Sequence, residues 1–139
     1  MARSRTLFIF ILLVGLFSSP SIFAHHGSAI YDTKNTVILT GTVTQLTLAN
    51  PHSWVAFDAK DDKGNVNHWV VEFGVLRELV SQGWTDTTLK PGDQVRVPLH
   101  PKRDGSCGGI LVTGITYADG RALPLNPPAN QHPARAIHW

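Results

Sequence analysis

Cysteine is almost absent from this sequence, since Cys107 is the single one in 139 residues. An intramolecular disulfide is therefore excluded, and the fold must rest on its hydrophobic core. Cys107 stands in the segment Asp104–Gly109, where a thiol can pair with a second chain, bind a soft metal or have no role. We interpret it as an incidental thiol.

Charge is scarce as well, because only 16% of the residues are Asp, Glu, Lys or Arg. Arg3 and Arg5 precede the first apolar run, and the ten basic side chains that follow balance ten acidic ones. A protein that binds nucleic acid through its phosphates needs a basic patch or stripe. The sequence has none, so we expect no nucleic-acid partner.

No apolar run is long enough to cross a membrane. The longest, Leu7–Phe17, has eleven residues, whereas a spanning helix needs about 20. The two arginines before it, Pro20 behind it and the segment Ile22–Ala24 form the pattern of a secretory signal peptide. We predict a signal peptide over residues 1–24 and a mature chain that begins at His25. The protein is then exported to the periplasm or secreted, with no stable membrane anchor after cleavage; an uncleaved N-terminal anchor is the alternative.

After the signal, apolar and β-branched residues alternate with a period of two, which is typical of strands. The apolar parity of the first strand changes between Val43 and Leu46, and this change predicts a β-bulge near Gln45. We expect strands at 36–48, 54–59, 66–73, 94–99 and 110–117, a helix at 75–82 that Gly83 ends, and a short last segment around Leu123.

Three strands, a short helix and two more strands follow the order of an OB-fold, a five-stranded, partly open barrel. We therefore predict a mainly β protein, with a small OB-like five-stranded barrel over residues 25–123 and a proline-rich flexible tail over residues 124–139. A small β-sandwich is the alternative. The residues expected in the core are Val37, Leu39, Val43, Val55, Phe57, Trp69, Val71, Phe73, Leu79, Val95, Val97 and Val112.

Known catalytic motifs are missing. The chain has no Gly-x-Ser-x-Gly, no His-Glu-x-x-His, no phosphate-binding loop and no dinucleotide fingerprint. We therefore expect a protein that is not an enzyme. A copper-dependent redox enzyme is a further alternative, which needs an open coordination position and a substrate surface.

Histidine is the residue type that points to chemistry, because all seven histidines follow the predicted signal peptide. Cleavage after Ala24 leaves His25 with a free α-amine, whose ordinary pKa is about 8, next to His26, whose imidazole has an ordinary pKa of about 6.5. The amine and ring of a terminal histidine can chelate one metal ion, and a further histidine completes a three-nitrogen set known as a histidine brace. Nitrogen-rich sets of this kind suit Cu(II).

His52 is our candidate for the third copper ligand. It follows Asn50-Pro51, a rigid bend between two predicted strands that can hold a side chain at a barrel rim. Two alternatives are open: His52 is a turn residue that hydrogen-bonds the backbone, or the terminal peptide binds copper without it.

A second candidate surface is a ligand face made of Trp54, His68 and Trp69, of the kind on which OB-folds bind their ligands. Core and rim packing accounts for the two tryptophans equally well. His68 and Glu72 are four residues apart in one predicted strand, or roughly 13 Å, so they cannot hold one ion together. We expect His100 in a solvated loop at the end of the fourth strand.

Several short blocks over about residues 24–123 carry a family resemblance. They are Ala24-His25-His26, Tyr31-Asp32, Leu39–Val43, Asn50-Pro51-His52, Val55–Gly64, Gly83-Trp84, Leu89–Val95, Asp104-Gly105-Ser106 and Asp119-Gly120-Arg121. In their order and spacing the chain resembles a group of short exported bacterial proteins, the domain of unknown function 6152. The resemblance implies a secreted OB-like β-barrel with no established activity.

Two hypotheses follow for the function. The first is an exported, non-enzymatic barrel that binds copper through His25, His26 and His52. The second is a metal-free module that binds a peptide, glycan or protein partner on its tryptophan face.

Overall fold

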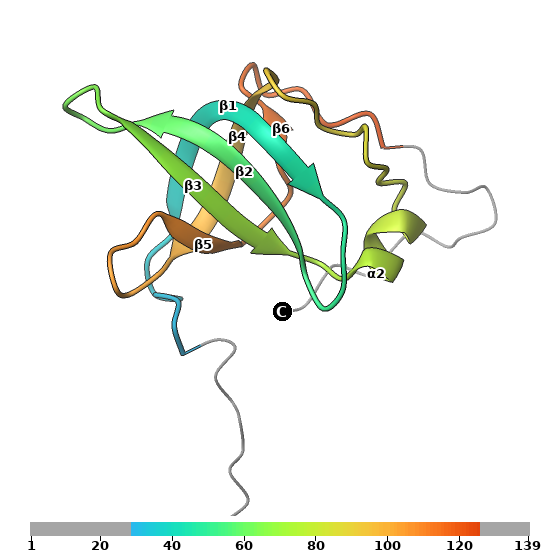
Figure 1. The fold of residues 1–139 in the computed structure, drawn as a ribbon, viewed down its shortest axis with the longest axis horizontal. Helices are drawn as coiled ribbons and strands as arrows, with labels where there is room; N and C mark the ends of the chain where they lie inside the picture. Colours follow the sequence, from blue (N-terminus) through green and yellow to red (C-terminus); the bar gives the residue numbers. More distant parts are fainter. Residues whose placement is uncertain (1–28, 126–139) are drawn as a thin grey trace, which may run out of the picture.

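The computed structural model describes residues 29–125 (Figure 1). The predicted signal peptide, His25 and His26 lie outside the described residues, as does the predicted tail after Leu125. The elements are β1 (Val37–Thr47), β2 (Ser53–Lys60), β3 (Val66–Phe73), α2 (Leu76–Ser81), β4 (Gln94–Pro101), β5 (Gly108–Leu111) and β6 (Thr116–Tyr117). Within residues 29–125, no helix is long and apolar enough to cross a membrane.

The strands close into a barrel. β1, β2 and β3 form an antiparallel meander, β3 then pairs in parallel with β5, and β5 pairs with β4. β4 returns to β1, which completes the ring (Figure 1). A closed ring of five strands with a helix between the third and fourth is the OB-fold arrangement. The predicted OB-like barrel is confirmed, and the alternative of a β-sandwich is wrong.

β1 reaches two partners because it bends at a bulge. Val43 pairs with Phe57 and Gln45 with Ala56, so Thr44 is the extra residue. Before the bulge, residues 37–42 of β1 pair with β4, and residues 41–47 pair with β2. The predicted bulge near Gln45 is therefore confirmed, and it lets one strand serve both sides of the barrel.

The predicted strand over 110–117 is divided in two. β5 pairs with the end of β4, through Leu99↔Leu111, and β6 pairs with its start, through Val95↔Tyr117. The chain bends at Thr113 between them. The segment from β5 to β6 therefore runs along β4, but its pairing with β4 is interrupted between Leu111 and Thr116.

α2 has only six residues, too few to be stable as an isolated helix. Its one buried side chain, Leu79, packs into the core. Gly83 has φ of 91° and follows the C-cap residue Gln82. This left-handed conformation favours glycine and ends the helix, as predicted.

The core contains most of the predicted residues. Eight of the twelve are buried: Val43, Val55, Phe57, Val71, Phe73, Leu79, Val95 and Val97. Leu39 and Trp69 are partly buried against them, whereas Val37 and Val112 are half-buried and the prediction that they belong to the buried core is wrong. Val37 is the first residue of β1 and Val112 follows the last residue of β5, so both lie at strand ends. The core residues that the sequence did not indicate are Ala59, Trp84, Leu89, Leu99, Leu111, Ile115 and Leu123.

Candidate functional site

The bend before His52 is held by a buried serine. Ser53 is 0% exposed, and its hydroxyl accepts a hydrogen bond from the Ala49 N–H at 3.1 Å and lies 3.3 Å from the Ala49 carbonyl oxygen. The backbone N–H of Ser53 donates to the carbonyl of Gly74, and the Asn50–Pro51 peptide bond is cis. These contacts join the β1–β2 turn to the end of β3 and define the position of His52 at the barrel rim.

His52 has a carboxylate partner across the sheet. Its Nδ1 atom lies 3.2 Å from Oε2 of Glu72, while the side chains of His52 and Glu72 are 57% and 39% exposed. Glu72 lies opposite Trp54 in the β2–β3 ladder. In the neutral tautomer that carries its proton on Nδ1, the N–H donates to the carboxylate and Nε2 keeps a free lone pair.

The segment before β1 is tied to the end of β4 by four hydrogen bonds to its backbone. Asp32 N–H donates to the Pro101 carbonyl at 2.8 Å, and Arg103 N–H donates to the Ile30 carbonyl at 2.9 Å. The Arg103 Nε–H donates to the Ala29 carbonyl at 3.1 Å, and His100 Nδ1 bonds to the Asn35 carbonyl at 2.9 Å. In Figure 1 this blue segment runs beside the orange β4–β5 loop.

Tyr31 anchors that segment. Tyr31 is 2% exposed, and its backbone forms an isolated antiparallel β-bridge with Lys102. Burial raises the pKa of the Tyr31 phenol to about 12, and the negative charge of Glu72 acts in the same direction. The buried hydroxyl has no hydrogen-bond partner of good geometry among residues 29–125. Glu72 therefore contacts His52 and also acts on Tyr31, so three residues from distant parts of the chain form one cluster.

A second histidine–carboxylate pair lies on the same face. Nδ1 of His68 bonds to Oδ1 of Asp58, its direct partner in the β2–β3 ladder. His68 is 81% exposed at its side chain. The two pairs are separated by the Ala56↔Val70 step of the ladder.

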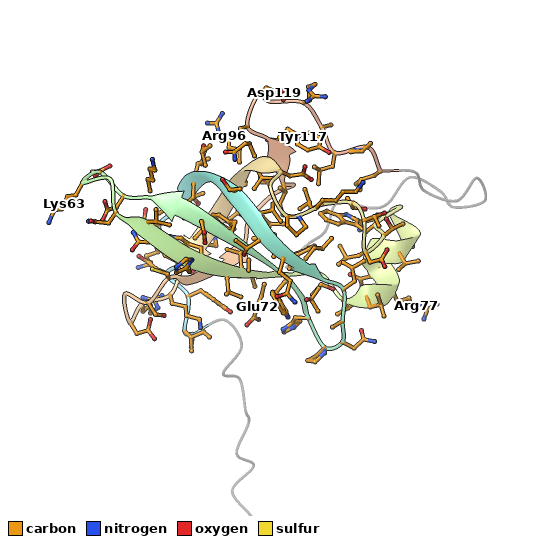
Figure 2. The ribbon with its side chains drawn as sticks, turned by 45° about the horizontal axis from the view of Figure 1, so that its top comes forward. Lys63, Glu72, Arg77, Arg96, Tyr117 and Asp119 are labelled. Atoms are coloured by element: carbon orange, nitrogen blue, oxygen red, sulfur yellow. The ribbon has the colours of Figure 1, made fainter. Side chains whose placement is uncertain are left out.

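The expected ligand face of Trp54, His68 and Trp69 is wrong as a single surface. Trp54 and His68 lie on the outer face, opposite Glu72 and Asp58, whereas Trp69 pairs with Phe57 and packs against the core. Successive side chains of a strand alternate between the two faces, so His68 and Trp69 cannot share one. Figure 2 shows Glu72 on the outer side of the sheet, away from Arg96 and Tyr117.

His100 also differs from its prediction. It lies within β4, is half-buried, and its Nδ1 contacts the Asn35 carbonyl. The expectation of a solvated loop residue is wrong because the strand continues two residues further than the sequence pattern indicates. Cys107 is half-buried, and its backbone carbonyl accepts the N–H of Val70 at 3.1 Å.

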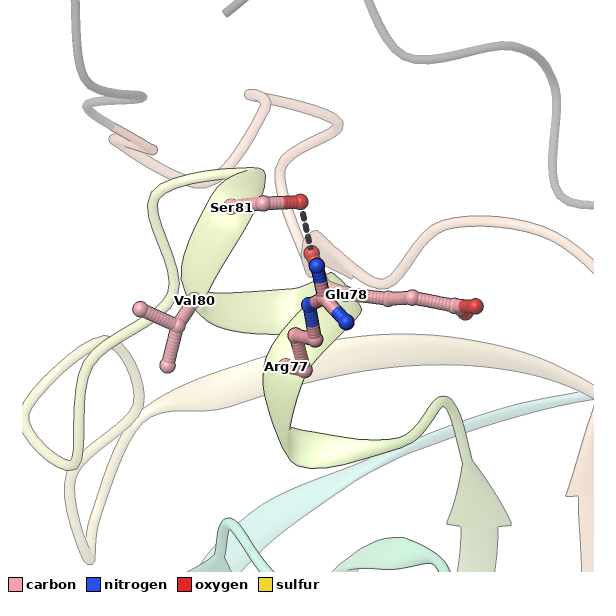
Figure 3. A pocket seen from close by; sticks show the side chains of 4 residues that line it. All are labelled: Arg77, Glu78, Val80 and Ser81. Carbon is pink, nitrogen blue, oxygen red and sulfur yellow. Dashed lines mark hydrogen bonds between the residues drawn. The ribbon is translucent and has the colours of Figure 1, made fainter.

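Two hollows lie away from this cluster. The larger, of about 760 Å³, lies on α2 and is lined by Arg77, Glu78, Val80 and Ser81 (Figure 3). The Ser81 hydroxyl donates to the Glu78 carbonyl of the helix itself at 2.6 Å. The smaller, of about 330 Å³, lies beside β6, where the Arg121 Nε is 2.7 Å from Asp119. Neither hollow is lined by Tyr31, His52 or Glu72.

Among the described residues, no group of three His, Cys, Asp or Glu side chains is arranged to hold a metal ion. His52 and Glu72 are the described part of the candidate site, and the predicted ligands His25 and His26 lie outside the described residues. Sequence reasoning missed Glu72 as the partner of His52 and Tyr31 as a buried residue of the segment before β1. The period-2 pattern placed Glu72 on the outer face of its strand, but the strand register that brings it to His52 is not visible in one sequence.

Comparisons with known proteins add the following. The crystal structure of the mitochondrial single-stranded DNA binding protein Rim1 from S. cerevisiae is similar to this chain, with a TM-score of 0.44 and 12% sequence identity. The similarity covers 60% of this chain and 94% of that one. The search of curated proteins found no match.

The family comparison covers most of the barrel. A sequence model described as a family of unknown function, DUF6152, matches residues 14–112. This range includes every strand from β1 to β5 and the residues of the Tyr31–Glu72–His52 cluster. The protein therefore belongs to the family of unknown function DUF6152.

Proposed function

We propose that this protein is an exported, non-enzymatic barrel that binds one copper ion through His52 together with His25 and His26. The observation that carries the proposal is the contact of 3.2 Å between His52 Nδ1 and the Glu72 carboxylate at an exposed rim. Histidines that bind metals almost always donate their other ring N–H to a carboxylate, a carbonyl or water, which orients the ring and raises its basicity. The contact between His52 Nδ1 and Glu72 is compatible with this arrangement.

The course of the chain supports the same proposal. Tyr31 is fixed against the barrel and its phenol is affected by Glu72, which in turn contacts His52. His25 precedes Tyr31 by six residues, and an extended chain covers about 3.3–3.6 Å per residue, or roughly 20 Å in all. This length is the upper limit of the distance between His25 and Tyr31.

The donor types favour copper. The set would consist of the terminal amine and imidazole of His25, the imidazole of His26 and Nε2 of His52. Nitrogen donors suit Cu(II), which also heads the affinity series of divalent first-row metals. Glu72 would remain the hydrogen-bond partner of His52.

The alternative is a metal-free module that binds a protein or small ligand on the outer face of β2 and β3. One observation favours it: Val70 is 45% exposed in the centre of that face, beside the half-buried Trp54. The face also carries Asp58 and Glu72 with Lys60 as its only basic residue, so we propose no role in binding nucleic-acid phosphates.

Two measurements test the proposal. Intact-mass analysis of the exported protein should give an N-terminus at His25; any residue ahead of it contradicts the brace. Copper titration of the cleaved protein should then show at least tenfold weaker binding for His52→Ala. His68→Ala is the matched control, because His68 has a carboxylate partner on the same face but lies at the far end of the ladder. Equal affinity in all three proteins would mean that the terminal peptide binds alone, and no binding by the wild type would favour the metal-free module.

A further inference from the structure

We propose that the free edge at the start of β3 pairs with the same edge of a second copy of this chain, in an antiparallel arrangement around Asn67. The free edge consists of the backbone N–H and C=O groups of Val66 and His68. Two barrels are then joined through one continuous sheet. This inference goes beyond the proposed function, and no metal ion takes part in it.

The backbone groups of Val66 and His68 point away from β2. The Val70 N–H donates to the Cys107 carbonyl at 3.1 Å, on the side of β3 where β5 lies rather than β2. Along an antiparallel ladder, every second residue directs its N–H and C=O groups to the same side. Val66 and His68 precede Val70 by four and two residues, so their backbone groups point to the same side as that N–H.

This edge has no partner in the described part of the chain. β5 pairs with β3 only at residues 70–72. Among residues 29–125, no backbone hydrogen bond reaches Val66 or His68 on the side away from β2. Val66 is 51% exposed, and Figure 1 shows the β2–β3 hairpin extending past β5. The start of β3 is therefore an open edge of an otherwise closed barrel.

The edge also lacks the features by which proteins prevent edge strands from pairing. Such strands usually carry lysine, proline or a β-bulge, or they are covered by another segment. Residues 66–69 are Val, Asn, His and Trp, and their register against β2 contains no bulge. A regular, exposed edge of this kind favours the addition of a strand.

A second copy of the chain satisfies the whole edge. When two β3 strands run antiparallel with Asn67 opposite Asn67, Val66 of each copy lies opposite His68 of the other. Their free N–H and C=O groups then bond to one another. A pairing centred on His68 would instead require the N–H of Val70, which already donates to Cys107. The register around Asn67 therefore uses the free groups and no others.

The charges on β2 agree with the same register. Lys60 lies opposite Val66 in the β2–β3 ladder, and Asp58 lies opposite His68. Each row across the paired sheets then begins with Lys60 of one copy and ends with Asp58 of the other. The two Asp58 carboxylates belong to different rows, so like charges do not lie directly opposite each other. Charge complementarity thus favours a second copy as the occupant of the edge.

Association is tested by sedimentation equilibrium of the exported protein from about 1 μM to about 1 mM. We expect a weak, concentration-dependent dimer, because the paired segment is short and stable interfaces bury about 1,200–2,000 Å². Val66→Lys should weaken the dimer about tenfold or more. Val66→Pro should do the same, since it removes an N–H outside the β2–β3 ladder at the first residue of β3. Val80→Lys is the control: Val80 is 49% exposed on α2, and its substitution should leave the association unchanged.

The register is tested by cross-linking. Asn67→Cys, combined with Cys107→Ser, should give a disulfide-linked dimer, because opposite Cα atoms in a non-hydrogen-bonded pair are about 4.5 Å apart and a disulfide spans about 4.4–6.8 Å. Asn65→Cys in the same background is the control. Its two copies would be offset by four residues, or roughly 13 Å, so it should not cross-link.

Three outcomes would contradict the proposal. A protein that stays monomeric over the whole range overturns the self-pairing and leaves a strand of another protein as the occupant of the edge. A dimer that both Val66 variants leave unchanged uses a different surface. Equal cross-linking of Asn67→Cys and Asn65→Cys refutes the register around Asn67.

Discussion

Trp54 and Trp69 lie on neighbouring strands and on opposite faces of one sheet, since Trp54 pairs with Glu72 and Trp69 with Phe57. Trp69 therefore contributes to the core, while Trp54 belongs to the outer face that carries His52, Glu72, His68 and Asp58. Because they lie on opposite faces, the two tryptophans cannot form one ligand platform. The His52 cluster is then the candidate site on the described surface.

Truncation of the two tryptophans should distinguish the two faces. Loss of a large aromatic side chain from a core typically costs about 3–5 kcal/mol, so Trp69→Ala should lower the free energy of unfolding clearly more than Trp54→Ala. Chemical denaturation of both variants measures the difference. Equal losses would show that Trp54 supports the core as much as Trp69 does.

The turn that presents His52 should depend on Ser53. Ser53→Ala leaves the Ala49 N–H without its partner, and such an unsatisfied buried group costs about 1–3 kcal/mol. We expect a loss of unfolding free energy in this range, measured by denaturant titration. Ser106→Ala is the comparison, because the Ser106 hydroxyl bonds to Asp104 at an exposed turn and its removal should change stability by less than about 0.5 kcal/mol.

Gly41 is required where β1 crosses from one partner to the other. A Cβ atom there would lie 2.4 Å from the Asp58 carbonyl oxygen and 2.7 Å from the Phe57 ring. Gly41→Ala should therefore destabilise the barrel by about 1–3 kcal/mol or more, because the strand must shift. At Gly114 a Cβ atom would meet nothing within 4 Å, so Gly114→Ala should be tolerated. Thermal unfolding of the pair tests this; a stable Gly41→Ala protein would mean that the strand spacing adjusts freely.

Stability should decline at high pH because of Tyr31. Its phenol has a pKa of about 12 in the folded protein, against about 10 in an unfolded chain. Between these values the unfolded chain loses the proton that the folded protein keeps, so ionisation favours unfolding. The contribution of the protonated Tyr31 phenol to the free energy of unfolding is complete below about pH 10. It is lost as the pH rises toward about 12.

Two measurements check the tyrosine prediction. The protein has two tyrosines, and the near-ultraviolet absorbance of tyrosinate in the wild type and in Tyr31→Phe assigns the late titration. Urea unfolding across the same pH range should show a steeper alkaline decline for the wild type than for Tyr31→Phe. Parallel declines would indicate that Tyr31 ionises as an ordinary solvent-exposed phenol.

Local pattern alone determined much of this fold. The alternation of apolar residues, the parity change after Val43, and Gly83 at the helix end are each read within a few neighbouring residues, and each has its counterpart in the barrel. The order of strands and helix then indicated an OB-fold, because few topologies accommodate three strands, a helix and two strands in one closed sheet. The position of His52 at a bend followed from Asn50-Pro51 in the same way.

Only the tertiary structure decided which groups meet. His52 and Glu72 are 20 residues apart in the sequence, and their contact depends on the register of β2 against β3, where a shift by one residue would move Glu72 to the other face. Tyr31 reaches Glu72 because the segment before β1 pairs with residues 101–103, a contact across about 70 residues with no local signal. Sequence periodicity specifies the face on which a side chain lies, whereas the partner it finds there depends on register and on the closure of the barrel.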